Sequence, residues 1–131
     1  MPFGESTSDE IERVATEVVD AAFKVHKALG PGLLESSYQT LMIYELEKRG
    51  LEVKHELPVP IKYDGRIFET NYRLDLLVEN LVIVEIKSVT EMIPLFKAQI
   101  LTYLKLMEKR LGILINFNVE LIKDGIKRVI R

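Results

Sequence analysis

The sequence contains no cysteine and no tryptophan, and only two histidines among its 131 residues. Without cysteine there is no disulfide, no thiolate zinc site, no cysteine-ligated iron–sulfur cluster and no cysteine nucleophile. Two histidines leave little for a histidine-rich metal site. The lack of cysteine fits a reducing compartment, and we expect the protein to be cytoplasmic.

Long hydrophobic runs are also absent. No segment approaches the roughly 20 apolar residues that span a bilayer, so no membrane association is expected. The first ten residues are polar and acidic, which is unlike a signal peptide. With 18 basic and 20 acidic residues, the chain lacks the basic excess typical of nucleic-acid binding proteins. Any nucleic-acid function must therefore depend on a local site.

The length and the 47% hydrophobic content indicate one domain over residues 1–131, with residues 1–8 flexible. Apolar residues at helical spacing predict a helix over 9–29, and Thr7 with Glu10 has the spacing of a capping box. The Gly30-Pro31-Gly32 sequence should end this helix, and a second helix is expected over 33–49.

The hydrophobic period then changes to two, which predicts strands. Residues 56–63 are expected at a sheet edge because Pro58 and Pro60 cannot donate hydrogen bonds, and Asp64-Gly65 predicts a hairpin turn. We expect a long strand over 66–78, bulged near Asn71. The remaining predicted elements are a strand over 81–88, a helix over 94–108, a strand over 111–117 and a short final strand within 119–131. This order predicts an α/β (α+β) domain with a mixed β-sheet flanked by helices.

Three charged residues lie inside apolar strand segments, namely Asp75, Glu85 and Lys87. Such charges are costly to bury unless they are paired or bind a metal. Directly opposed residues of an antiparallel pair share a face, so Asp75 opposes Glu85 if the connecting loop has an odd number of residues. A three-residue loop at 79–81 satisfies this condition, whereas a two-residue loop would oppose Asp75 to Val84 and require a bulge.

Two carboxylates and a lysine on one face suit hydrolysis of phosphodiesters with a divalent metal. The carboxylates would hold Mg²⁺ or Mn²⁺, and Lys87 would orient the attacking water or offset negative charge. The alternative is a salt-bridged sheet edge in which Lys87 only neutralises Glu85.

Asp75 followed by Glu85-Ile86-Lys87 resembles the signature of the PD-(D/E)xK nuclease superfamily. Residues 32–38 read GLLESSY and match GxxExxY, the signature that names a family of small proteins in that superfamily. Further segments resembling this family are 25–31, the QxxxY spacing of Gln99 and Tyr103, and Asn116-Phe117. The resemblance spans about residues 11–130.

This resemblance implies a restriction-endonuclease-like core and assigns roles by position. Asp75, Glu85 and the Ile86 carbonyl would be metal ligands, and Lys87 would be the catalytic lysine. Glu35 would reach the metal directly or through water. The chain departs from the family pattern on the strand that carries Asp75. Leu74 stands where a small residue is common, and Asn71 where glycine is common.

The residues expected around the metal ligands each have an alternative, purely structural role. Glu35 could act only on the helix dipole, and His26 could be a core or helix-end histidine or could bind Glu35 or a phosphate. Tyr38 and Tyr103 could be core aromatics. Gln99 alone would be a surface residue, whereas with Tyr103 it could contact a phosphate or order Lys87.

The leading hypothesis is therefore a nuclease that uses Mg²⁺ or Mn²⁺ and acts on DNA, with RNA not excluded. The charge of −2 instead favours a second hypothesis, a catalytically silent module that keeps the fold and acts with a partner protein or as a homodimer. A third hypothesis is hydrolysis of a nucleotide or another phosphate ester. Three clustered carboxylates should repel one another, so at least one pKa is expected to be raised.

Overall fold

Two helices begin the chain, and strands with one further helix follow them. The computed structural model describes residues 7–131. Its elements, in order, are α1 (Asp9–Leu29), α2 (Glu35–Lys48), β1 (Val53–Pro58), β2 (Ile61–Tyr63), β3 (Arg66–Phe68), β4 (Arg73–Val78), β5 (Val82–Lys87), α3 (Pro94–Met107), β6 (Leu111–Asn116), the 3₁₀ helix η1 (Ile122–Gly125) and β7 (Ile126–Ile130). No helix in this range is long and apolar enough to cross a bilayer.

The first helix has the predicted bounds but a different N-cap. Ser8 is the cap, and its hydroxyl accepts a hydrogen bond from the Ile11 amide at 3.2 Å. The predicted capping box was wrong, because the Thr7 hydroxyl instead donates to the Glu12 carboxylate. Of residues 1–8, for which flexibility was predicted, 1–6 lie outside the described range. At the other end, Gly30 has φ 66° and ends the helix as expected.

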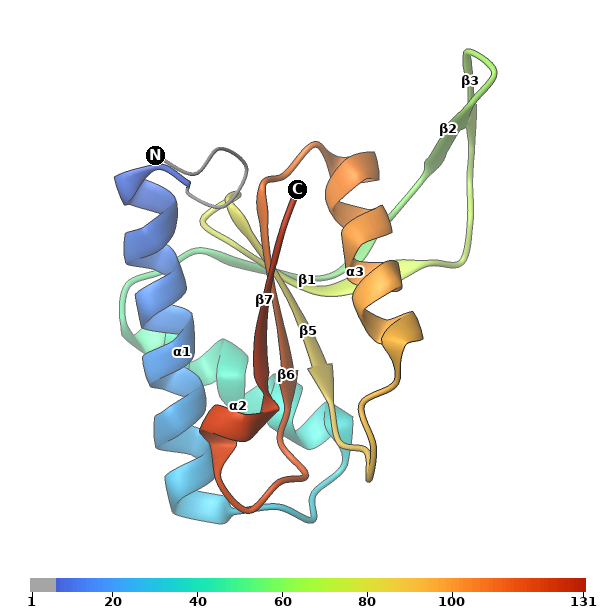
Figure 1. Ribbon diagram of the computed structural model, residues 1–131. Helices are drawn as coiled ribbons and strands as arrows, with labels where there is room; N and C mark the ends of the chain where they lie inside the picture. Colours follow the sequence, from blue (N-terminus) through green and yellow to red (C-terminus); the bar gives the residue numbers. More distant parts are fainter. Residues whose placement is uncertain (1–6) are drawn as a thin grey trace.

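Five strands form one sheet in the order β1-β4-β5-β6-β7. Only β5 and β6 are parallel, and α3 makes the crossover between them. The other neighbouring pairs are antiparallel, so the sheet is mixed. Figure 1 shows α1 and α2 on one face of this sheet and α3 on the other. The predicted fold class, a mixed sheet flanked by helices, is confirmed.

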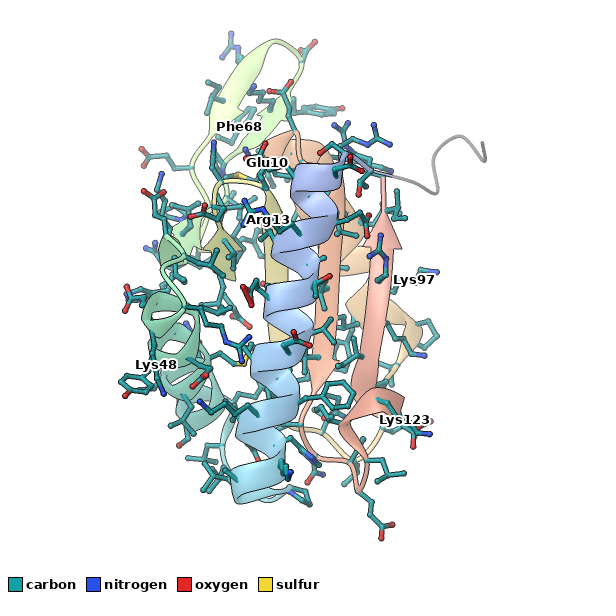
Figure 2. All side chains as sticks on the ribbon, turned by 90° about the vertical axis from the view of Figure 1, so that its left-hand side faces the viewer. Glu10, Arg13, Lys48, Phe68, Lys97 and Lys123 are labelled. Atoms are coloured by element: carbon teal, nitrogen blue, oxygen red, sulfur yellow. The ribbon has the colours of Figure 1, made fainter. Side chains whose placement is uncertain are left out.

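Two predicted strands are each divided in the structure. Segment 56–63 belongs partly to β1 and partly to β2, and segment 66–78 is split into β3 and β4. The chain leaves the main sheet where Val59 donates its amide to the Tyr72 carbonyl at 2.9 Å and Thr70 donates its hydroxyl to the Val59 carbonyl. The β2–β3 pair is a separate hairpin that projects beyond the main sheet (Figures 1 and 2).

The hairpin turn itself agrees with the prediction. Tyr63 pairs with Arg66, and both residues between them have positive φ, 54° at Asp64 and 70° at Gly65. Two such residues in sequence give a turn whose twist matches that of the flanking strands. The hairpin therefore forms from local sequence preferences, although it lies outside the main sheet.

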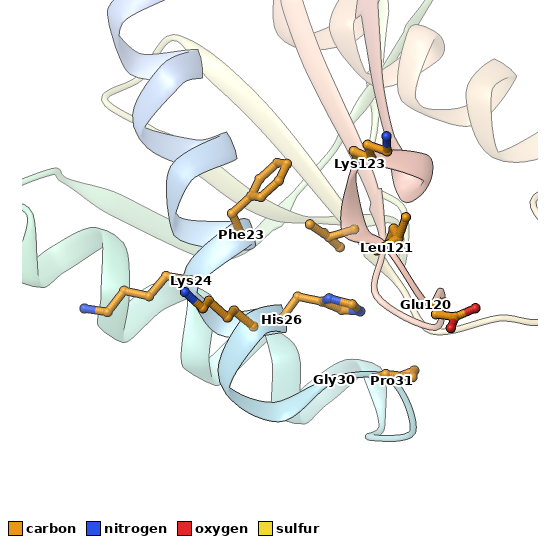
Figure 3. A pocket seen from close by; sticks show the side chains of 10 residues that line it. Phe23, Lys24, His26, Gly30, Pro31, Glu120, Leu121 and Lys123 are labelled. Atoms are coloured by element: carbon orange, nitrogen blue, oxygen red, sulfur yellow. The ribbon is translucent and has the colours of Figure 1, made fainter.

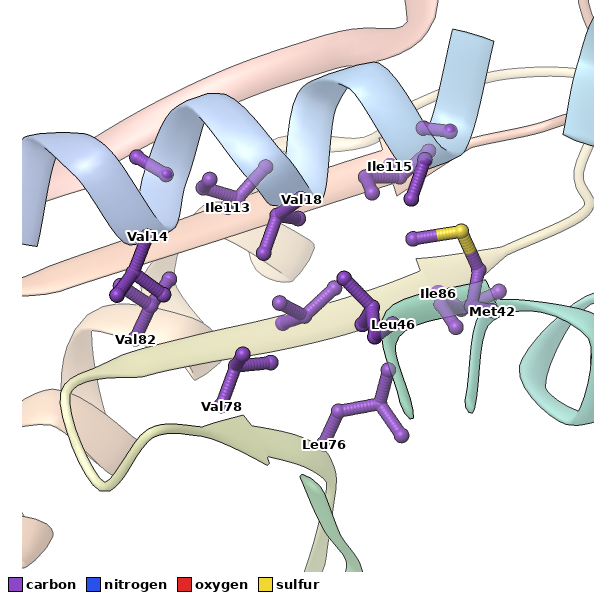
Figure 4. Close-up of a cluster of buried hydrophobic side chains, with 14 of the residues drawn as sticks. Val14, Val18, Met42, Leu46, Leu76, Val78, Val82, Ile86, Ile113 and Ile115 are labelled. Atoms are coloured by element: carbon purple, nitrogen blue, oxygen red, sulfur yellow. The ribbon is translucent and has the colours of Figure 1, made fainter. Parts of the chain in front are cut away.

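The sheet buries apolar side chains on both faces. On one face α1 and α2 pack Val14, Val18, Met42 and Leu46 against strand residues such as Ile113 (Figure 4). On the other face α3 packs Ile100, Tyr103 and Leu104 against residues that include Leu77 and Ile83. Because side chains alternate along β5, Glu85 follows Ile83 onto the α3 face.

Candidate active site

The turn between β4 and β5 sets the register of the candidate site. Val78 pairs with Val82 across the three-residue loop 79–81, as predicted. Glu79 and Asn80 have φ values of 53° and 57°, the left-handed conformation that such loops need. The register therefore places Asp75 opposite Glu85.

The two strands part at this row of residues, and the carboxylates replace the backbone pairing. The last paired residues are Leu76 and Val84. Beyond them, the Asp75 amide donates to Oε2 of Glu85 at 2.7 Å. Reciprocally, the Ile86 amide donates to Oδ2 of Asp75 at 2.7 Å. Each carboxylate is thus fixed by the backbone of the opposite strand, and we call Asp75 and Glu85 the crossed carboxylate pair.

Both members of the crossed carboxylate pair resist ionisation. Burial raises the pKa of Glu85 to about 8, and the negative charge of Asp75 adds to the shift. Burial likewise raises the pKa of Asp75 to about 6. The expected direction is confirmed, although burial contributes more than repulsion between carboxylates. A nearby cation would relieve this cost.

The donor atoms of the pair fit a divalent cation. Within residues 7–131, hydrogen bonds occupy only one oxygen of each carboxylate, and neither second oxygen is a buried atom without a partner. No three acidic, histidine or cysteine side chains in this range are grouped closely enough to hold a metal. Mg²⁺ is commonly bound by one or two carboxylates, with water and substrate phosphate completing its coordination. Hard oxygen donors of this kind match that requirement.

Glu35 lies beside the pair rather than within it. It is exposed at the start of α2, and its Oε2 accepts from the Ser88 amide at 3.4 Å. Ser88 also donates its hydroxyl to the Leu33 carbonyl at 2.7 Å, which ties the turn before α2 to the end of β5. Glu35 is close enough for its charge to contribute to the raised pKa of Asp75.

Lys87 occupies the last position of β5. Its Nζ lies 4.6 Å from the centroid of the Phe96 ring, a cation–π contact. Among the described residues, no ion pair joins Lys87 to Glu85 or Asp75. Its positive charge nevertheless lowers the pKa of both carboxyls. The geometry thus differs from the salt-bridged edge considered as an alternative.

Gln99 and Tyr103 lie on α3 and line the same groove. Tyr103 is only 5% exposed. Burial raises the pKa of its hydroxyl, and the charge of Glu85 adds to this, while Gln99 acts in the opposite direction. Tyr103 therefore lies within electrostatic reach of the crossed carboxylate pair.

His26 and Tyr38 make structural contacts on the α1–α2 side of the sheet. The Nε2 of His26 is 2.8 Å from the Val119 carbonyl, and Figure 3 shows its ring pointing toward this loop. The Tyr38 hydroxyl donates to the Gly30 carbonyl at 2.6 Å and accepts from the Leu33 amide. Both residues thereby hold the turns around the site.

Sequence reasoning missed Glu56 and Gln39. The β1–β4 register places Glu56 opposite Asp75, and Glu56 has the unusual φ of 49° for a strand residue. Its charge contributes to the raised pKa of both Asp75 and Glu85. Gln39 donates to Oε2 of Glu56 at 3.0 Å and to the Asp75 carbonyl at 3.5 Å. Only the strand register reveals this group, because nothing in the local sequence distinguishes Glu56.

Comparison with known proteins agrees with this geometry. No curated protein and no solved structure matches the chain significantly. A family model described as the PD-(D/E)XK nuclease superfamily matches residues 12–129, which include every element that builds the site. The mixed sheet with its flanking helices is consistent with the restriction-endonuclease-like fold of that superfamily. The chain belongs to the PD-(D/E)XK nuclease superfamily.

Proposed function

We propose that this protein hydrolyses phosphodiester bonds of DNA with Mg²⁺ or Mn²⁺ as cofactor. The observation that carries the proposal is the crossed carboxylate pair, in which the buried Glu85 and the half-buried Asp75 are held by backbone amides and face no compensating ion pair among the described residues. Superfamily membership supports nuclease chemistry at this position.

In this proposal the second oxygens of Asp75 and Glu85 hold the metal together with the Ile86 carbonyl. A bound divalent ion supplies Lewis-acid catalysis and a more acidic water. Glu35 accepts a hydrogen bond from the Ser88 amide at the end of β5, and it would hold water near the ion. Lys87, held over the Phe96 ring, keeps its ammonium group near the reacting phosphate and offsets the charge that develops there.

The Gln99 and Tyr103 side chains would orient the substrate phosphate or Lys87. Both face the groove beside the carboxylates, and the partly exposed Gln99 can donate to a phosphate oxygen.

We further propose that the chain is of the GxxExxY type. Each signature residue has a distinct place in the local structure, since Gly32 has φ 111°, Glu35 begins α2, and Tyr38 is fully buried. A side chain at Gly32 would be strained at this φ.

A cleavage assay tests the proposal with labelled DNA and RNA, in Mg²⁺, in Mn²⁺ and in EDTA. We expect metal-dependent cleavage of DNA that falls by at least about 100-fold in Asp75→Asn and in Lys87→Ala. The matched control is Lys48→Ala, since Lys48 is an exposed lysine in the last turn of α2 (Figure 2). Equal activity in all four proteins would remove the active-site assignment.

A thermal titration with the same metals provides a readout independent of substrate. Metal should raise the Tm of the wild type. At a metal concentration about one hundred times Kd, the free energy of unfolding should increase by about 2.7 kcal/mol. Asp75→Asn keeps an oxygen that can accept from Ile86 and should stabilise the metal-free protein while losing the metal response. If neither metal binding nor cleavage is found in the wild type, the chain is instead a silent module of the same fold.

A further inference from the structure

A groove lies between the base of the β2–β3 hairpin and one face of α3. The hairpin side contributes Ile61 and Tyr72, and α3 contributes Leu95, Gln99, Tyr103 and Leu106. We call it the Tyr72 groove. Its volume of about 410 Å³ is in the range of pockets that hold small organic ligands. Figure 1 shows the hairpin projecting from the sheet on the side of α3.

The groove has one accessible aromatic ring, that of Tyr72, which lies beside the nearly buried ring of Tyr103. The Tyr72 ring is 6.4 Å from the Tyr103 ring, with the two planes inclined by 58°. Tyr72 is 53% exposed and Leu95 is 67% exposed, so an entering flat ring can contact both. Such lining favours a ligand with a planar apolar face, and aromatic side chains stack well on nucleobases.

Tyr103 links the groove to the crossed carboxylate pair. It lines the groove and also belongs to the buried cluster between α3 and the sheet, which includes Leu77 of β4 and Ile83 of β5. The charges of Glu85 and Asp75 act on the Tyr103 hydroxyl, which places the aromatic wall within electrostatic reach of the carboxylates. A ligand in the groove would therefore extend toward the proposed metal ligands.

The segments that form the groove are positively charged, unlike the whole chain. Segments 59–73 and 94–107 together carry five basic and two acidic residues, and α3 itself has no acidic residue. The chain as a whole has a net charge of −2. A groove with an exposed tyrosine ring, carried by segments of net positive charge, is complementary to a base attached to a phosphate backbone.

We propose that the Tyr72 groove binds one unstacked nucleobase of the substrate strand while the adjoining phosphate lies at the crossed carboxylate pair. A base inside a duplex must be unstacked before it can enter such a groove, whereas a base in a single strand is already accessible. The substrate is therefore single-stranded DNA or a frayed end rather than intact duplex. This inference rests on the proposed function for the identity of the phosphate, but base binding can be measured without cleavage.

The test measures the affinity of a short fluorescent single strand by anisotropy in EDTA. Tyr72→Ala should weaken binding by about 5- to 150-fold, the effect expected from losing one base stack, whereas Tyr72→Phe should bind like the wild type. Tyr72 makes hydrogen bonds through its backbone N–H and C=O, which these substitutions keep. The matched control is Tyr44→Ala, because Tyr44 is a 63% exposed tyrosine on α2 and should leave the affinity unchanged.

A strand of abasic sites separates base stacking from phosphate binding. The abasic strand should bind the wild type as weakly as the normal strand binds Tyr72→Ala. Its affinity for Tyr72→Ala should be the same as its affinity for the wild type. The proposal is overturned if duplex and single strand bind equally well, or if Tyr72→Ala and Tyr44→Ala have the same affinity. It is also overturned if sedimentation shows that Tyr72→Ala dissociates a dimer, since a second copy would then occupy the groove.

Cleavage assays on the same proteins distinguish this inference from the proposed function. Base-dependent binding without cleavage of any substrate would support base binding in the Tyr72 groove and contradict the proposed nuclease activity. Metal-dependent cleavage of intact duplex that is unchanged in Tyr72→Ala would support the nuclease and contradict the groove.

Discussion

Replacing Glu85 by Gln tests whether ionisation of the crossed carboxylate pair destabilises the folded protein in the absence of metal. Glu85 is only 5% exposed, and its Oε2 accepts from the Asp75 amide at 2.7 Å. Glutamine has nearly the same shape and keeps an oxygen that can accept this hydrogen bond. The substitution therefore removes the charge and little else.

The magnitude follows from the pKa of Glu85, which rises from 4.5 to about 8 on folding. Because the folded state holds the proton more tightly, the free energy of unfolding falls as the pH rises from the unfolded pKa toward the folded one. The limiting slope is about 1.4 kcal/mol per pH unit. Between pH 5 and pH 7 the metal-free wild type should lose roughly 2–3 kcal/mol relative to Glu85→Gln, or about 10 °C in Tm.

Urea unfolding in EDTA across that pH range measures the difference. The matched control is Glu45→Gln, since Glu45 is also buried, at 6% exposure, but pairs with Lys24 at 3.0 Å. The hydrogen bond from Lys24 lowers the pKa of Glu45, so its charge stabilises the folded state above the unfolded pKa and its removal should destabilise at pH 7. Parallel pH profiles for the wild type and Glu85→Gln would refute the reasoning.

Two further substitutions test how the structure around the site is held. Tyr38→Phe removes the hydroxyl that bridges Gly30 and Leu33 and should cost about 1–3 kcal/mol in urea unfolding, because two partly buried hydrogen bonds to the backbone are lost. An unchanged midpoint would mean that water replaces the hydroxyl. Gly125→Ala would drive a Cβ into the Asn116 carbonyl oxygen and should destabilise by at least about 2 kcal/mol or prevent folding. If Gly125→Ala were as stable as the wild type, the backbone segments at Gly125 and Asn116 would be able to move apart without cost.

The crossed carboxylate pair was predictable because two independent features of the sequence agreed. Asp75 and Glu85 can act together only if they lie on the same face of the sheet. The loop 79–81 has the odd number of residues that puts them there. Asn80 also tolerates the positive φ that the loop requires. Local chemistry and strand periodicity therefore predicted Asp75 opposite Glu85 on the condition of a three-residue loop, and the structure has that loop.

The departure of the hairpin from the main sheet was not predictable from periodicity. Segments 56–63 and 66–78 keep the alternation of strands through the points where the chain leaves the sheet. What divides them is a contact between distant residues, the hydrogen bond from the Val59 amide to the Tyr72 carbonyl. The Tyr72 groove depends on this division, so the sequence alone did not indicate it.

Helical spacing also failed to predict the burial of apolar residues at the ends of helices. Leu29 and Leu34 are apolar residues within the predicted helices 9–29 and 33–49, yet they are 50% and 74% exposed. Leu34 is the N-cap of α2 and Leu29 the last residue of α1, where the chain turns away from the sheet. Periodicity describes the middle of a helix and fails at its ends, because the local backbone direction changes there.

The arrangement around Asp75 explains how acidic groups can be fixed before any metal binds. The row that contains Asp75 is not paired with β1 at Glu56 or with β5 at Glu85. The pairing with β1 resumes at Leu74, whereas the pairing with β5 ends at Leu76. The amides of Asp75 and Ile86 are satisfied by carboxylate oxygens, so the loss of backbone pairing leaves no unsatisfied donor at these two positions. Since the protein backbone already orients the ligands, a cation need not reorganise them. Metal binding should therefore change the stability of the fold much more than its conformation.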